Sequence, residues 1–181
     1  MKSKAIKLFL LIALCGSARV RAQSPSPLEG RAAPRLETGV RVGPAVPSTT
    51  QLKGKVVLVF FWAHWCEDCK ALAPILGRVL EKYRSPDLVV IAPTRLYGYV
   101  ADGRSAPPTK EVPYIAQVRD RFYPFLRQAP TPVSEANQKR YGIDVVPTLI
   151  LIDRNGTVRF QHAGQMTEEA LDSALQGLLR T

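Results

Sequence analysis

Two cysteines three residues apart, Cys66 and Cys69, are the residues of this 181-residue chain best suited to chemistry. In the first turn of a helix, such a pair lies on one side and is close enough to form a disulfide. Unpaired backbone N–H groups and the positive end of the helix dipole stabilise a thiolate there. We expect Cys66 to be the more exposed sulfur and the nucleophile, and Cys69 to attack the mixed disulfide that follows. The pair therefore predicts thiol–disulfide exchange.

Other uses of the cysteine pair have less support in the sequence. A zinc site needs two more ligands, and the chain after residue 22 offers only His64 and His162 beyond the pair. Haem attachment needs a histidine directly after the second cysteine, where Lys70 stands. A purely structural disulfide stays open for an oxidising compartment, although an exposed helix start argues against it. We expect no metal and no cofactor.

The elements that must position this pair follow from hydrophobic patterning. The continuous apolar run 56–61 predicts a strand buried on both faces. Apolar residues from Leu72 to Tyr83 recur with helical spacing and predict a helix that Pro74 kinks. A second buried strand is expected at 88–92, and further strands at 148–152 and 158–162. The last two are joined by a turn at Asn155-Gly156 and followed by a final helix that Thr167 caps. This order predicts an α/β fold with a central mixed sheet flanked by helices.

The stretch 93–132 is the least regular part of the pattern and forms an insertion between the second strand and Pro147. It carries Tyr97 and Tyr99 and then a helix that we expect Thr109 to cap. The expected core residues of that helix are Ile115, Val118 and Phe122. Ser134 and Gly142 are typical of the start and end of a short helix.

The first 22 residues are typical of a secretory signal peptide. A basic start precedes a short apolar run, and cleavage is expected after Ala22. Lipid attachment at Cys15 ranks second, because Leu14 precedes it where a small residue is usual. Residues 23–50 read as a proline-rich linker with an edge hairpin around 36–46, and residues 51–181 as the folded domain.

The charge pattern excludes one class of partner. Without the five basic residues of 1–22, the formal net charge falls from +10 to +5. A charge of that size concerns solubility, and no basic block with interleaved aromatic residues appears. We therefore expect no nucleic-acid binding.

The stretch Phe61-Trp62-Ala63-His64-Trp65-Cys66-Glu67-Asp68-Cys69-Lys70 resembles the active-site motif of the thioredoxin superfamily. Three more features agree with that family in type and spacing. They are Pro74, the stretch Val146-Pro147-Thr148 and Gly164. Leu52-Lys53-Gly54-Lys55, Ile152-Asp153-Arg154-Asn155-Gly156 and the leader are similar to the exported TlpA/ResA-type reductases.

The resemblance implies roles for residues around the cysteines. Pro147 would be cis and lie beside the pair, with the backbone of Val146 pairing to an extended client segment. Trp65 would form an apolar wall, or serve only in ordinary packing. One departure concerns proton transfer, because Phe60 occupies the position of the buried carboxylate of thioredoxins. His64 could take over this proton transfer, but we expect it to be an exposed side chain without a catalytic role.

The residues between the cysteines suggest the direction of electron flow. Glu67 and Asp68 are anionic, oppose the helix dipole and should raise the pKa of Cys66. The sequence thus predicts an exported, periplasmic reductase of client proteins with cysteines or disulfides. We expect a monomer that a membrane electron donor keeps reduced.

Two other functions stay open. A peroxidase of the peroxiredoxin type would need a Thr/Ser-rich loop before its cysteine, and Ala63-His64-Trp65 offers none. A non-catalytic binding module or chaperone could instead use a groove around Trp65, Tyr97, Tyr99 and Pro147.

Overall fold

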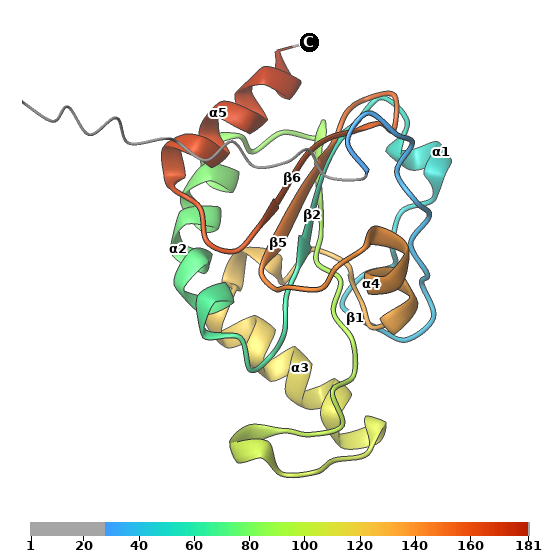
Figure 1. Ribbon diagram of the computed structural model, residues 1–181, viewed down its shortest axis with the longest axis vertical. Helices are drawn as coiled ribbons and strands as arrows, with labels where there is room; N and C mark the ends of the chain where they lie inside the picture. Colours follow the sequence, from blue (N-terminus) through green and yellow to red (C-terminus); the bar gives the residue numbers. More distant parts are fainter. Residues whose placement is uncertain (1–27, 181) are drawn as a thin grey trace, which may run out of the picture.

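A four-stranded sheet forms the centre of the molecule in the computed structural model, which describes residues 28–180 (Figure 1). The strand order is β3-β2-β5-β6. The strands are β2 (Val56–Phe61), β3 (Leu88–Ile91), β5 (Thr148–Ile152) and β6 (Val158–Ala163). β2 runs parallel to β3 and antiparallel to β5, which is antiparallel to β6. The predicted mixed sheet is confirmed. The expected signal peptide and Cys15 lie outside the described residues.

The position of each strand in the sheet decides its burial. Every residue of β2 is buried, as the apolar run 56–61 predicts. The second strand was also expected to be buried, but three of the four residues of β3 are only half-buried. This expectation was wrong because β3 is an edge strand and one of its sides has no strand neighbour.

Helices cover both faces of the sheet. Leu58 and Phe60 of β2 pack in one hydrophobic core with α2 (Glu67–Lys82) and α5 (Glu168–Leu179). Val57 and Val59 point to the other face, because successive side chains of a strand alternate. That second face packs against α4 (Glu135–Tyr141) and the chain before β2. The expected sheet flanked by helices is therefore present.

The segment before β2 is packed against the domain and forms no hairpin of its own. β1 (Arg41–Val42) pairs antiparallel with β4 (Thr131–Pro132), more than 80 residues later. The expected edge hairpin at 36–46 was wrong, since local patterning cannot reveal so distant a partner. Leu36 and Val46 nevertheless contribute apolar surface to the second core. A short helix, α1 (Thr49–Leu52), precedes β2.

The insertion consists of a loop, a long helix and a return segment. It contains η1 (Ala101–Gly103), α3 (Pro108–Phe122) and η2 (Pro124–Leu126). The loop and the start of α3 project from the lower end of the molecule in Figure 1. The cap expected at Thr109 was wrong, because Pro108 opens the helix and Pro107 is the cap. Proline suits the first helical position, where the missing N–H is no loss.

Most other expected helix ends agree with the structure. α2 begins directly after Cys66 and continues through Pro74. α4 lies between Ser134 and Gly142, whose φ of 61° is left-handed, as a helix-ending glycine allows. Thr167 caps α5 through its side chain. Within residues 28–180, no helix is long and apolar enough to cross a membrane.

Candidate redox site

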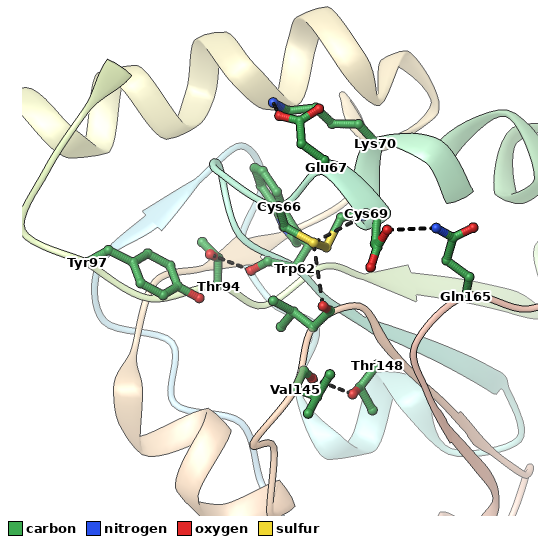
Figure 2. Close-up of a disulfide and its surroundings, with 12 residues drawn as sticks. Trp62, Cys66, Glu67, Cys69, Lys70, Thr94, Tyr97, Val145, Thr148 and Gln165 are labelled. Carbon is green, nitrogen blue, oxygen red and sulfur yellow. Dashed lines mark hydrogen bonds and ion pairs between the residues drawn. A yellow bond between two sulfur atoms is a disulfide. The ribbon is translucent and has the colours of Figure 1, made fainter. Parts of the chain in front are cut away.

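The two cysteines form a disulfide at the N-terminus of α2 (Figure 2). Their Cα atoms lie 5.2 Å apart. Cys66 is the helix cap and Cys69 lies in the first turn. Cys66 is 3% exposed and Cys69 is fully buried, so Cys66 is the more accessible residue, as expected.

The start of α2 gives Cys66 a hydrogen-bond donor. The backbone N–H of Cys69 donates to Cys66 Sγ at 3.0 Å. In the reduced protein, this N–H and the positive helix end would favour the thiolate of Cys66. The first turn of α2 thus has the polarity that a cysteine nucleophile needs.

The loop before β5 lies against the sulfur atoms. The Val146–Pro147 peptide bond is cis, as the family resemblance implies. Cys66 Sγ lies 3.5 Å from the carbonyl oxygen of Val146. The hydroxyl of Thr148 donates to the carbonyl of Val145 at 2.6 Å and fixes the loop from below in Figure 2. Val146 therefore lies beside the disulfide, and the cis bond joins it to Pro147.

Two polar side chains hold the backbone that leads into the site. Trp62 Nε1 donates to the carbonyl of Ala92 at 3.0 Å, and the Thr94 hydroxyl donates to the carbonyl of Trp62 at 2.8 Å. All three residues are buried. Sequence reasoning did not single out Thr94 or this role of Trp62. The signal available was a threonine two residues after the expected strand 88–92.

The two acidic residues between the cysteines have partners. Glu67 accepts from Lys70 Nζ at 2.6 Å, and Asp68 accepts from the Gln165 amide at 2.7 Å. Figure 2 shows the two partners, Lys70 and Gln165, on different sides of the disulfide. Lys70 offsets much of the negative charge of Glu67, whereas neutral Gln165 leaves the charge of Asp68 in place. Their combined effect on Cys66 is therefore smaller than two free carboxylates would give.

His64 is buried, whereas the sequence predicted an exposed side chain. It is 2% exposed, and its Nε2 lies 3.3 Å from Oε1 of Glu111, which is fully buried. Burial lowers the pKa of His64, and the Glu111 carboxylate opposes this shift. The expectation failed because the residues that cover His64 come from the insertion. Phe60 occupies the position where thioredoxins carry a buried carboxylate, and its side chain is fully buried.

Aromatic residues of the insertion contact the active-site loop. The Tyr97 ring meets Trp65 edge-on at 5.4 Å between centroids. Trp65 itself is 45% exposed. Tyr97 and Trp65 therefore lie together, next to the cysteine that follows Trp65. Tyr99 packs near His64 instead.

The described part of the chain has a cavity away from the cysteines. Among residues 28–180, no three metal-ligating side chains lie together. A cavity of about 900 Å³ lies between the 33–53 segment and the sheet. Its lining residues include none of the disulfide site, so it does not mark the redox centre.

Comparisons with known proteins agree with this geometry. A family described as a thioredoxin-like domain matches residues 45–178. The thioredoxin-like protein YneN of Bacillus subtilis is 27% identical over 78% of this chain and 82% of its own. The thiol-disulfide oxidoreductase ResA of Geobacillus thermodenitrificans is 27% identical over 71% of this chain. That match spans 66% of ResA, just under two thirds of its length.

A solved structure is similar in three dimensions. It belongs to a Chlorobium tepidum protein proposed to be the thiol:disulfide interchange protein DsbE. The identity is 26% and the TM-score is 0.56, with 80% of this chain and 99% of that chain covered.

Proposed function

Since the chain belongs to the thioredoxin-like domain family, we propose that it is an extracytoplasmic thiol–disulfide oxidoreductase that reduces disulfides of client proteins. One observation carries the proposal. Cys66 and Cys69 are at disulfide distance on a helix N-terminus, with the Cys69 N–H directed at Cys66 Sγ. The thiol-disulfide oxidoreductase named among the relatives supports the same chemistry.

The first step is attack on the client disulfide. The Cys66 thiolate attacks one client sulfur, a Cys66–client disulfide forms and the client S–S bond breaks. The departing client sulfur leaves as a thiolate and takes a proton from water. The Cys69 N–H and the helix end stabilise the thiolate of Cys66 before this attack.

The second step releases the client. The Cys69 thiol loses its proton and its sulfur attacks Cys66 Sγ, which breaks the mixed disulfide. The Cys66–Cys69 disulfide forms and the client keeps two thiols. A dithiol on a membrane-bound donor would then return two electrons and two protons to the pair. The basic and apolar leader at residues 1–22 supports an extracytoplasmic location for this cycle.

Trapping with a Cys69→Ala variant tests the function. Without the resolving sulfur, the Cys66–client disulfide should persist and accumulate. Extracytoplasmic fractions separated without reductant should then contain covalent complexes that mass spectrometry identifies. The Cys66→Ser variant is the matched control and should trap nothing. Equal trapping by both variants, or none by Cys69→Ala, would refute the exchange mechanism.

A further inference from the structure

A buried carboxylate of the insertion joins two segments beside the redox site. Glu111 lies in the first turn of α3 and is fully buried. Besides its contact with His64, it accepts hydrogen bonds from the N–H groups of Tyr97 at 2.6 Å and Gly98 at 2.9 Å. A buried carboxylate needs such partners to offset its lost hydration. Glu111 therefore fixes the Tyr97 backbone relative to the loop that leads to Cys66.

The side chain of Tyr97 is held as firmly as its backbone. Its ring meets His64 edge-on at 5.4 Å and Trp65 at the same separation. Its hydroxyl accepts a hydrogen bond from Gln138 of α4 at 3.3 Å. Figure 2 shows Tyr97 on the side of the disulfide opposite Gln165. Contacts from three elements leave Tyr97 little freedom.

Exposed apolar surface gathers around the disulfide. Within the described residues, the large hydrophobic side chains that are exposed are Val40, Trp65 and Val145. Trp65 directly precedes Cys66, and Val145 directly precedes Val146, whose carbonyl oxygen lies 3.5 Å from Cys66 Sγ. An apolar surface kept open beside a reactive sulfur indicates a binding role for that surface.

The chemistry of exchange determines what occupies this surface. A client sulfur must reach Cys66 Sγ, so the residues next to the client cysteine must lie against the neighbouring walls. Among residues 28–180, no hydrogen bond uses the N–H of Val146. That group is free to pair with an extended client backbone. An extended polypeptide thus fits the site better than a small thiol compound.

We infer that Trp65 and Tyr97 form a rigid aromatic wall that selects extended polypeptides with an apolar side chain next to the reactive cysteine. Glu111 acts through Tyr97 and is a positioning residue. The inference rests on the proposed function and names the substrate class of the same site. It assigns the insertion a role in client choice.

Single-turnover reduction of two peptides tests whether the aromatic wall prefers an apolar residue beside the client cysteine. Each substrate is a disulfide-linked peptide dimer, with phenylalanine beside the cysteine in one and serine in the other. The reduced wild-type protein should react faster with the phenylalanine peptide. Tyr97→Ala should lower this preference about tenfold, the loss expected for one aromatic contact. Tyr97→Phe keeps the ring and should retain the preference.

A tyrosine at the far end of α2 supplies the matched control. Tyr83 follows the C-terminus of α2, about 24 Å along the helix from the cysteines. Tyr83→Ala should leave the preference unchanged. Glu111→Gln should lower the preference for the phenylalanine peptide. If Glu111 only stabilised the fold, the variant would reduce both peptides more slowly by the same factor. If Glu111→Gln does not fold, Tyr97→Ala decides alone.

The outcomes separate this inference from the proposed function. A wild-type protein that reduces both peptides at equal rates would overturn the aromatic wall and leave the oxidoreductase function intact. An equal loss on both peptides in Tyr97→Ala would also overturn it. A wild-type protein that reduces neither peptide nor hydroxyethyl disulfide would overturn the proposed function itself.

Discussion

Cys66 is surrounded by single residues that act on it in opposite directions. The N–H of Cys69 favours its thiolate, whereas the carboxylates of Glu67 and Asp68 oppose it. Lys70 pairs with Glu67 at 2.6 Å and reduces the effect of that acid. We therefore still propose that the protein acts as a reductase. Asp68 is the acid whose charge its partner does not offset, because that partner, Gln165, is neutral.

Replacing Glu67 tests this balance. Glu67→Gln leaves Lys70 unpaired, and its positive charge should lower the pKa of Cys66 by roughly half a unit or less, as for an exposed ion pair. The more stable thiolate should raise the reduction potential by about 10 mV. Thiolate absorbance against pH and equilibrium with glutathione measure the two effects.

Glu81→Gln is the matched control for that experiment. Glu81 lies near the other end of α2, about 21 Å from Glu67, and also pairs with an exposed basic residue. Glu81→Gln should change neither the pKa of Cys66 nor the reduction potential. A rise in the Cys66 pKa in Glu67→Gln would contradict the balance described above.

His64 should make stability depend on pH. Burial lowers its pKa in the folded protein, with Lys70 lowering it further and Glu111 opposing. Below about pH 6.5 the unfolded chain therefore binds a proton that the folded chain does not yet bind. The free energy of unfolding should fall as the pH drops through this window, by at most about 1.4 kcal/mol per pH unit.

The His64→Asn variant checks the origin of this dependence. It cannot titrate at residue 64, while His162 stays in both proteins. Urea denaturation at several pH values should therefore give a flatter profile below about pH 6.5 for the variant. Parallel profiles would assign the dependence to other groups.

At the scale of elements, the helix ends position the site. α2 must begin at Cys66 to present its N–H groups, and α5 packs beside α2 on the same face of the sheet. Arg78 and Lys82 of α2 form ion pairs with Glu168 and Asp172 of α5. These pairs are largely exposed, so packing contributes more than charge to the association.

The cap of α5 gives a prediction at this scale. Thr167 accepts the N–H of Ala170 at 3.2 Å. Thr167→Ala leaves that donor without its partner and should lower the free energy of unfolding by about 1 kcal/mol. Thr167→Ser keeps the oxygen and should retain most of the stability. Equal losses in urea denaturation of both variants would show that the hydroxyl is not the cause.

At the scale of the whole molecule, the chain before β2 covers one face of the sheet. Leu36 and Leu52 pack on the core that contains Val57 and Val59. The hydroxyl of Tyr141 donates to the carbonyl of Pro34 at 2.6 Å and ties this segment to α4. The segment completes the domain in space, although its composition is typical of a linker.

Removing the segment tests its contribution. A chain that starts at residue 53 would expose the apolar face around Val57 and Val59 to water. We expect it to lose cooperative urea unfolding and to bind a hydrophobic dye, in comparison with a chain that starts at residue 28. Cooperative unfolding at the same urea concentration would show that the segment contributes no stability.

The sequence by itself predicted the structural features that depend on residues close together in the chain. The run 56–61, the helix after Cys66 and the cap at Thr167 follow from local periodicity and backbone chemistry, and each is present. The cysteine pair at the helix start and the cis bond before Pro147 were also expected, from spacing and from family resemblance. Such features need little information from distant parts of the chain.

Only the tertiary structure decided which distant segments meet. Glu111 lies 47 residues from His64, yet it contacts that buried histidine and accepts the backbone N–H of Tyr97, whose ring lies beside Trp65. β1 pairs with β4, and β3 takes the edge of the sheet, for reasons that no local pattern contains. Burial and pairing depend on the packing of the whole chain, so the surroundings of Cys66 became visible only in three dimensions.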